Sequence, residues 1–353
     1  MADLVTPETE NEAASLLAQT GSAAVAFKGA GTKADWGRPP NRLDLIVRTT
    51  KLTGVIDHAA GDMVAVVRAG TPLAQLQQVL AANGQQLAID SPAAEATVGG
   101  VVAANVSGPR RLAYGTIRDL LIGVTIVRAD GVIARAGGRV VKNVAGYDLG
   151  KLFTGSFGTL GLITECVFRL HPLPGTSITV TAPVDDPAQV LTAIRHAQLT
   201  PSAVEIDMPS GVPATLAILL EGGAAAARAE VAARLLGPDA VQAVPPWWNS
   251  YPWTAGGIGM KVCVPLSAVP ALSTVGVHLR GSAGTGVLYA SVPPERVAQV
   301  RDAARKAGGH STVITSPQLI DEDPVPGINI MRRIKNQFDP SGRLAPGTFV
   351  AGI

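Results

Sequence analysis

The sequence predicts an α+β protein of two domains, and three observations support this prediction. The chain has 353 residues, a length that suggests two domains rather than one. Short apolar strand patterns alternate with helical patterns along the whole chain. Residues 171–174 (HPLP) interrupt this series, and a new set of elements follows. We therefore expect a first domain over residues 1–173, a second, smaller domain over residues 174–327, and a C-terminal helix and tail over residues 328–353 that pack back on the first domain.

The elements of the first domain follow from periodicity and from turn residues. Residues 6–20 form the first predicted helix, with Thr6 as its N-cap and Pro7 in its first turn. Asp130 and Gly131 mark the turn of a hairpin. The other expected elements are strands at 23–27, 43–48, 63–69, 86–89 and 162–168, helices at 73–82 and 97–105, and hairpin strands at 120–128 and 132–135.

The second domain is expected to alternate strands and helices of its own. Its predicted elements are strands at 177–182, 215–221, 259–264 and 286–292, and helices at 187–198, 224–236 and 294–307. A C-terminal helix at 328–338 then runs into a tail that is rich in turn residues.

Composition narrows the classes of partner and the location. Twenty-nine basic and 27 acidic residues leave a net charge of +2 without any run of Lys or Arg, so nucleic acid is not an expected partner. The two cysteines, Cys166 and Cys263, are too few for a disulfide framework or for a zinc or iron–sulfur site, and we expect no metal. We also expect no signal peptide and no transmembrane segment. The predicted location is the cytoplasm, with a peripheral position on the inner membrane face as the alternative.

Three glycine clusters lie in the first half of the chain. Gly29-Ala30-Gly31 follows a strand, Gly99-Gly100 opens a predicted helix, and residues 155–161 (GSFGTLG) precede an apolar strand. Loops of this kind turn backbone N–H groups toward anions, and unpaired N–H groups at the start of a helix favour a phosphate. The three clusters together favour one long, phosphate-bearing ligand. The alternative is that the glycines serve only turns and tight packing.

Two common phosphate-binding folds are excluded by the residues that follow the first cluster. Ala34 stands where the dinucleotide-binding fingerprint needs its third glycine. Pro39 and Pro40 also prevent the long helix that the fingerprint requires. The phosphate-binding loop of NTPases is excluded as well, because no Gly-Lys-Ser/Thr triplet follows the spaced glycines.

The order of these motifs resembles the FAD-binding domain of the vanillyl-alcohol-oxidase, or PCMH, type of flavoprotein. The similar stretches are 29–32 (GAGT), 97–105 (TVGGVVAAN), 142–148 (KNVAGYD) and 158–164 (GTLGLIT). The resemblance covers about residues 1–173, and the tail at 338–347 (FDPSGRLAPG) is similar to that of the 2-hydroxyacid-oxidising branch. Length and motifs most resemble the E subunits of bacterial glycolate oxidases. The resemblance implies a two-subdomain PCMH-type FAD-binding domain followed by a smaller α+β cap domain.

The cofactor that the resemblance implies is FAD. The first loop and residues 97–105 would hold the pyrophosphate, mostly through backbone N–H groups, and residues 158–164 would lie beside the adenosine and the flavin. Family members with covalent FAD carry a histidine in the first loop, whereas this loop has none, so the implied FAD is non-covalent. The FAD-binding residues implied by the resemblance are Lys28, Gly29, Ala30, Gly31, Thr32, Lys33, Pro92, Thr97, Val98, Gly99, Gly100, Ala103, Asn105, Gly108, Lys142, Asn143, Gly146, Tyr147, Gly158, Thr159, Leu160, Gly161, Ile163 and Thr164.

Three side chains between residues 142 and 148 have alternative roles. Lys142 would lie near the pyrimidine edge of the flavin, where a cation stabilises the negative charge of the reduced ring, or it would be an ordinary solvated lysine. Tyr147 would stack or donate a hydrogen bond, or it would be buried against the core. Asp148 is expected to cap a helix that begins at Leu149.

The sequence identifies no catalytic base. Complete flavin oxidisers of 2-hydroxy acids resemble one another in a histidine-rich segment of the second domain, but the nearest equivalent here, residues 281–289, has no histidine. Arg280 or Lys261 is a candidate for binding a carboxylate. Three tryptophans within residues 247–253 either fill the edge of the core or meet a partner. Metal-ligand spacing (HxH or HxxxH) is absent among the histidines, which are His58, His171, His196, His278 and His310.

These features predict an FAD-binding subunit of a glycolate oxidase-like complex. The expected partners are a larger FAD-binding 2-hydroxyacid oxidase subunit and an iron–sulfur subunit, and membrane contact is expected only through these partners. The expected reaction oxidises a small 2-hydroxy acid to the 2-oxo acid and passes the electrons through flavin to the partner subunits. The alternatives are a stand-alone FAD-dependent 2-hydroxyacid dehydrogenase and a non-catalytic, flavin-binding scaffold subunit.

Overall fold

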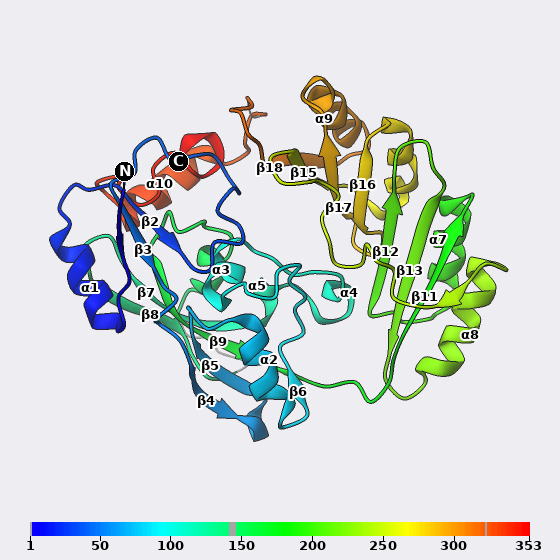
Figure 1. Cartoon of the computed structure of the whole chain (residues 1–353), viewed down its shortest axis with the longest axis horizontal. Coiled ribbons are helices and arrows are strands. Elements are labelled where there is room, and N and C mark those ends of the chain that lie inside the picture. The colour runs from blue at the N-terminus through cyan, green and yellow to red at the C-terminus, as the bar shows by residue number, and fades with distance from the viewer. Residues whose placement is uncertain (1, 141–145, 322) are drawn as a thin grey trace. The chain divides into compact units, whose positions relative to one another are not determined.

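The computed structural model describes residues 2–140, 146–321 and 323–353, and the chain forms two compact units (Figure 1). Unit 1 contains Met1–Ser107, Gly115–Leu173 and Asp321–Ile353, and unit 2 contains Gly108–Tyr114 and Pro174–Ile320. The sequence predicts residues 108–114 in the first domain, whereas the structure groups them with unit 2. One reason is that the hydroxyl of Tyr114 donates a hydrogen bond of 3.0 Å to the carboxylate of Glu221.

Unit 1 is built on two main sheets and a small two-stranded ladder. Its strands are β1 Asp3–Val5, β2 Val25–Lys28, β3 Leu45–Arg48, β4 Val55–Ala59, β5 Val64–Arg68, β6 Gln85–Gln86, β7 Leu121–Val127, β8 Ile133–Gly137, β9 Leu162–Arg169 and β10 His171–Pro172. The first sheet is parallel with the order β1-β3-β2, and the second is antiparallel with the order β4-β5-β9-β7-β8. β6 and β10 pair with each other.

The helices of unit 1 connect these strands. They are α1 Glu10–Gln19, α2 Leu73–Ala81, α3 Val98–Ala103, α5 Ile117–Leu120, α6 Gly150–Phe153 and α10 Ile328–Phe338. The predicted N-cap of the first helix, Thr6, is wrong, because Thr9 is the cap and accepts a hydrogen bond of 3.1 Å from the Glu12 N–H. The Glu12 carboxylate in turn accepts from the Glu8 N–H at 2.9 Å. This pair of bonds resembles a capping box and fixes the later start.

One apolar cluster connects the two main sheets of unit 1. Leu17 of α1 packs in the same cluster as Val25 and Val47 of the parallel sheet and Val127 of the antiparallel sheet. Leu344, in the C-terminal tail, is fully buried in this cluster and forms a parallel bridge with Val25. The tail is therefore part of the core of unit 1, at the edge of the strand that leads into the first glycine loop.

Unit 2 is built on a single eight-stranded sheet. Its strands are β11 Ser177–Val184, β12 Ala203–Met208, β13 Ala214–Glu221, β14 Val241–Gln242, β15 Ile258–Cys263, β16 His278–Ser282, β17 Val287–Val292 and β18 His310–Thr315. Its helices are α4 Arg111–Tyr114, α7 Pro187–His196, α8 Ala225–Leu236, α9 Val297–Lys306 and the 3-10 helix η3 Pro270–Val275. The strand order is β14-β11-β13-β12-β16-β17-β15-β18, and every pair is antiparallel.

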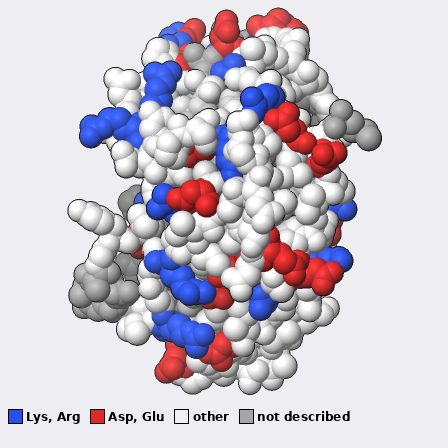
Figure 2. All heavy atoms as spheres, turned by 90° about the vertical axis from the view of Figure 1, so that its left-hand side faces the viewer, with Lys and Arg blue, Asp and Glu red and all other residues white. Residues whose placement is uncertain are grey.

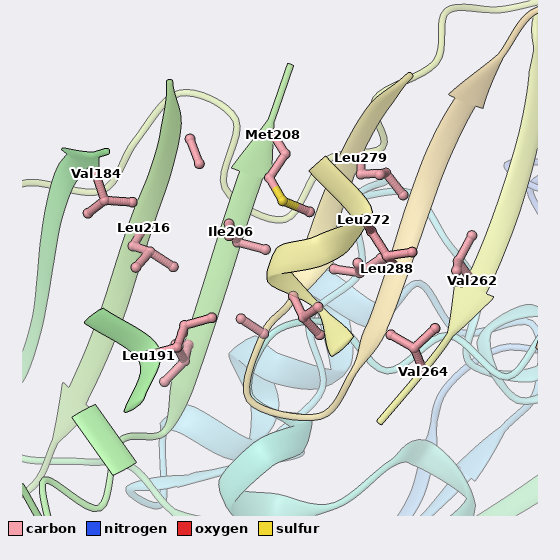
Figure 3. Packing of buried hydrophobic residues seen from close by; sticks show 14 of the residues in the cluster. Val184, Leu191, Ile206, Met208, Leu216, Val262, Val264, Leu272, Leu279 and Leu288 are labelled. Carbon is pink, nitrogen blue, oxygen red and sulfur yellow. The ribbon is translucent and has the colours of Figure 1, made fainter. Parts of the chain in front are cut away.

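The two faces of the sheet in unit 2 differ in polarity. Alternate residues of β12, such as Ile206, point into an apolar cluster that also contains Leu272 of η3 and Leu288 of β17 (Figure 3). Because side chains alternate between the faces of a strand, Glu205 and Asp207 lie on the opposite face. Residues of α7, α8, α9 and η3 belong to the apolar cluster. Polar and aromatic side chains lie on the other face, which we call the polar face of unit 2.

Periodicity predicted the elements with strong local patterns and missed several strands. The helices α2, α7 and α8 and the strands β5, β7 and β9 are confirmed within a few residues. Strand β12 was missed although it is wholly buried, because the partners of its Asp207 come from β16, which a local pattern does not contain. The strands and α-helices missed by the sequence analysis are β1, β4, β10, β12, β14, β16 and β18 and the short helices α4 and α5.

The surface shown in Figure 2 carries basic and acidic side chains side by side. This distribution matches the net charge of +2. Nucleic-acid binding requires an extended basic patch, and the face in Figure 2 shows none. Within the described residues, no helix combines the length and the apolar character that a membrane-spanning segment needs.

We expect the substitution Val180→Ala on β11 to lower the free energy of unfolding by about 2 kcal/mol. Val180 is fully buried, and its truncation removes two methyl groups from a packed core and leaves a cavity. Val241→Ala is the matched control, because Val241 lies on the neighbouring strand β14 and is 56% exposed. The measurement is urea unfolding followed by tryptophan fluorescence, and an equal loss in both variants would contradict this description of the core.

Candidate functional site

The three glycine segments, which lie far apart in the sequence, contact one another in unit 1. A Cβ atom added to Gly29 would lie 2.1 Å from the Oγ1 of Thr97, which is less than any normal contact. A Cβ added to Gly158 would lie 3.0 Å from the ring of Phe27, the residue of β2 just before the first loop. The absence of side chains at Gly29 and Gly158 therefore allows the first loop to touch the second segment and β2 to touch the third.

Helix α3 packs on the third glycine segment at its C-terminal end. The N–H of Gly155 donates to the carbonyl of Val102, and the N–H of Phe157 donates to that of Ala103, both at 3.0 Å. Asn105 lies two residues after the end of α3, has a φ of 52° and contacts Gly155. These contacts place the end of α3 and residues 155–158 in one packed layer.

The N-terminus of α3 differs from the sequence prediction of unpaired N–H groups. Thr97 is the N-cap, and its Oγ1 accepts from the Gly100 N–H at 3.3 Å. The N–H of Val98 donates to Thr71, and the N–H of Gly99 donates to Ala69 at 2.7 Å. The prediction of free donors at this helix start is therefore wrong, because a threonine cap and the chain after β5 already accept these hydrogen bonds.

The free donors lie on the first loop instead. The backbone N–H groups of Gly29, Ala30, Gly31 and Thr32 donate no hydrogen bond to the part of the chain that the structure describes. Gly31 has a φ of 84°, in the left-handed region, so the loop turns sharply there. Four successive N–H groups in a turning backbone form the kind of concave surface that binds an anion.

Two buried polar atoms lie where α3 meets the third glycine segment. The Oδ1 of Asn105 and the Oγ of Ser156 have no hydrogen-bond partner among the described residues. A buried polar atom without a partner is destabilising, so each of these atoms is a candidate for contact with a ligand or an ordered water. Ser156 is not among the predicted site residues, although it stands inside the glycine segment that the sequence analysis singled out.

Several predicted residues do not join this group. Lys142 and Asn143 lie outside the described residues. Tyr147 is 92% exposed, so the alternative that it is buried against the core is wrong. No heavy atom beyond the two chain neighbours lies within 4 Å of a Cβ added to Gly146.

Other predicted residues differ in burial and in the unit to which they belong. Pro92 is exposed, and Gly108 belongs to unit 2. Gly161 leads into β9, where Ile163 and Thr164 are buried. The Thr164 hydroxyl already contacts the carboxylate of Glu10 at 3.1 Å and the carbonyl of Thr125 at 3.3 Å.

The predicted helix cap at Asp148 is also wrong. Helix α6 begins at Gly150 with Leu149 as its N-cap, and no side chain makes a capping hydrogen bond there. Asp148 instead lies 3.9 Å from the ammonium of Lys151, one turn further along. A helix of a single turn has little dipole for a carboxylate to complement, which removes the reason for a cap.

Lys28 and Lys33 lie at the two ends of the first loop. The side chain of Lys28 occupies the space beside Gly31. The ammonium of Lys33 lies 5.2 Å from the ring centre of Trp36, in a cation–π contact. Burial lowers the pKa of Lys33, and the nearby carboxylates of Asp35 and Glu95 act in the opposite direction.

On the polar face of unit 2, one carboxylate is bound by an imidazole and a guanidinium. Asp207 Oδ1 lies 2.6 Å from Nε2 of His278 and 2.8 Å from Nε of Arg280. Burial raises the pKa of Asp207, but the hydrogen bonds from His278 and Arg280 outweigh it and hold the pKa below its usual value. Arg280 also donates to Ser250 at 2.7 Å, so the arginine predicted to bind a substrate carboxylate is already bound to protein groups.

The tryptophan-rich loop lies on this same polar face. Tyr251 stacks on Trp253 with ring centres 4.7 Å apart, and both rings meet Tyr289 of β17 edge-on. A Cβ added to Gly259 of β15 would lie 2.6 Å from the Trp253 ring, so this indole lies flat against the strand. The three tryptophans of the loop, Trp247 among them, are half-buried. Their burial favours neither of the two predicted roles, which are filling the edge of the core and meeting a partner.

Comparison with known proteins identifies the family of this chain. A family model described as an FAD binding domain matches residues 2–137. The glycolate oxidase subunit GlcE of Escherichia coli (strain K12) is 31% identical over 343 residues, which cover 93% of each chain. The chain belongs to the PCMH-type family of FAD-linked oxidoreductases.

Two further relatives show how widely this flavoprotein fold extends. The glycolate oxidase subunit GlcD of Bacillus subtilis (strain 168) is 34% identical over 188 residues, which span 52% of this chain and 40% of GlcD. The structure of an alkyldihydroxyacetonephosphate synthase aligns over 97% of this chain and 75% of that chain, with a TM-score of 0.69 and 18% identity. The second likeness concerns the fold alone.

The residues at the candidate site fit FAD as the cofactor of this family. The free N–H groups of the first loop suit a pyrophosphate, and the lone polar atoms of Asn105 and Ser156 offer hydrogen bonds to a polar ligand. Glycines at the contacts between the segments allow their backbones to approach closely. The structure thus offers donors and acceptors in one packed group.

We expect the substitution Gly29→Ala to weaken FAD binding by roughly tenfold, because the added methyl group displaces Thr97 and with it the first loop. The dissociation constant is measured by titrating FAD-free protein and following the quenching of flavin fluorescence. Gly61→Ala is the control in the same unit, since a Cβ there meets nothing within 4 Å. Equal affinity of the two variants would contradict the placement of FAD at these segments.

Proposed function

We propose that this chain is the FAD-binding subunit of a glycolate oxidase-like complex that oxidises a small 2-hydroxy acid to the 2-oxo acid. The support is the similarity to GlcE over 93% of both chains, together with the free donors of the first loop. The similarity to GlcD over part of the chain supports a larger, related flavin subunit as one partner. The third proposed component is an iron–sulfur subunit that receives the electrons.

The proposed FAD site uses each glycine segment differently. The N–H groups of the first loop would bind the pyrophosphate, and Asn105 and Ser156 would bind polar atoms of the cofactor nearby. Residues 158–161, which are buried, would lie beside the adenosine and the flavin. FAD bound there would supply the capacity to accept two electrons from the hydroxyl-bearing carbon of a substrate or from a partner flavin.

The first loop contains no histidine, so we propose that FAD is held without a covalent bond. Backbone N–H groups bind a pyrophosphate reversibly, and their hydrogen bonds are lost when the protein unfolds. Precipitation with acid should therefore release the flavin into the supernatant, where its absorption is measured. Flavin that stays in the washed pellet would contradict this proposal.

The polar face of unit 2 supports a role as a subunit rather than as a complete enzyme. Oxidation of a 2-hydroxy acid needs a base for the hydroxyl proton and a cation for the carboxylate. His278 and Arg280 are two such groups on this face, and both are bound to Asp207. We propose that substrate is oxidised chiefly at the partner flavin subunit.

A second candidate function is a stand-alone 2-hydroxyacid dehydrogenase. One observation favours it: a carboxylate that holds an imidazole by hydrogen bonding, as Asp207 holds His278, is the usual arrangement of a general base. In this case His278 would accept the hydroxyl proton at the nitrogen that does not face Asp207.

Glycolate or D-lactate, added with an artificial electron acceptor to the purified chain, separates the two functions. We expect no bleaching of the flavin by substrate in the chain alone, and dye reduction once the co-expressed partner subunits are present. The control is the variant His278→Gln, which should leave the rate of the complex unchanged. Bleaching of the isolated chain that is lost in His278→Gln would support the stand-alone enzyme instead.

A further inference from the structure

The ammonium group of Lys335, near the end of α10, is buried and fully hydrogen-bonded. It donates to the carbonyl of Thr159 at 2.8 Å, to the carboxylate of Asp339 at 2.7 Å and to the carbonyl of Leu344 at 2.7 Å. The three protons of the ammonium thus have three acceptors. Only one of these acceptors, Thr159, lies outside the C-terminal segment, and it belongs to the third glycine segment.

Asp339 completes this buried group. It is fully buried, and its Oδ2 accepts both from Lys335 and from the backbone N–H of Leu344, each at 2.7 Å. Leu344 in turn bridges Val25 of β2, three residues before the end of the strand that leads into the first loop. One ion pair therefore connects the third glycine segment with the strand that carries the first loop.

The same helix also holds the residues just before the third glycine segment. The ring of Phe338 meets that of Phe153 edge-on, with centres 5.4 Å apart. Phe153 ends α6, two residues before Gly155. Apart from its bond to Lys335, the carbonyl of Thr159 accepts no hydrogen bond from the described residues. Loss of Lys335 would thus leave a buried carbonyl unpaired in the glycine segment.

We propose that Lys335, with Asp339, is a positioning residue for FAD: it fixes the backbone of Thr159 relative to β2 and so sets the spacing between the third glycine segment and the first loop. The inference rests on the proposed placement of FAD at these segments. The carbonyl of Thr159 accepts from a charged donor, and this bond fixes the backbone between Gly158 and Leu160, both of which are buried. A shift of this backbone would move the floor of the cofactor site without removing any group that touches FAD.

Arg343 provides a matched comparison within the same tail. It is also buried, at 4% exposure, and its guanidinium donates to Thr20 Oγ1 at 2.6 Å and to the carbonyls of Leu17 and Ala129. These partners belong to the end of α1 and to the turn after β7, and none belongs to a glycine segment. Arg343 therefore anchors the tail as Lys335 does, but at a place that the proposed FAD site does not use.

The experiment compares the double variant Lys335→Met/Asp339→Leu with Arg343→Met in the full-length chain. The double variant removes both charges, so it does not leave an unpaired carboxylate in the core as Lys335→Met alone would. The unfolding temperature of the FAD-free protein measures the structural loss in each variant. FAD affinity is measured by the quenching of flavin fluorescence, and the environment of the flavin by its visible circular dichroism.

We expect the double variant to bind FAD about tenfold or more weakly than Arg343→Met at a similar unfolding temperature, with an altered flavin dichroism. Equal losses of affinity in the two variants, or wild-type affinity in the double variant, would overturn the positioning role. The variant Gly29→Ala distinguishes failure of the proposed FAD site from failure of the proposed role of Lys335. If it too binds FAD normally, the proposed site has failed; if it binds weakly while the double variant binds normally, only the role of Lys335 has failed.

Discussion

Close approach of the backbone at glycine is the constraint on which the candidate site of unit 1 depends. Gly29 and Thr97 are neighbours only because no Cβ stands between them, since an added methyl group would lie 2.1 Å from the threonine hydroxyl. That hydroxyl also caps α3, so the same contact fixes the start of the helix. The first loop is thereby held against α3 without any side chain of its own, and its N–H groups remain available. A loop that held itself in place with side chains would cover the surface that it now leaves open.

The C-terminal tail supplies the second part of this arrangement. A buried ion pair gives little net stability, because desolvation of the two charges offsets most of their attraction. Burial accordingly lowers the pKa of Lys335, while Asp339 raises it. The pair instead fixes the positions of the backbone groups around it, since the ammonium has three acceptors and the carboxylate accepts from Leu344 as well. An apolar contact of equal size would bury similar area but would not specify the position of a single carbonyl.

The sequence was informative where structure is local and less so where it depends on distant partners. Leu76 and Leu80 of α2, spaced at one helical turn, needed only their own neighbours to indicate a helix. By contrast, Asp207 on β12 is tolerated in a buried strand because His278 and Arg280 come from β16, some 70 residues later. The start of α3, within the candidate site, also depends on distant partners. Its glycines suggested free N–H groups, but the acceptors that bind them come from the chain around Ala69 and Thr71, which no local pattern reveals.

Partners that are distant in the sequence also determine what unit 2 can contribute under the proposed function. Its polar face contains residue types of an active site, among them an imidazole and a guanidinium, yet both of these groups bind Asp207. A substrate carboxylate would have to replace Asp207 at Arg280, and it would leave the buried Asp207 with one cationic partner fewer. The low pKa of Asp207 reflects how strongly the present pairing is favoured. Because Arg280 already has its anion, this pair is better suited to maintaining a fixed surface than to exchanging ligands, which supports the proposal that substrate is oxidised at a partner.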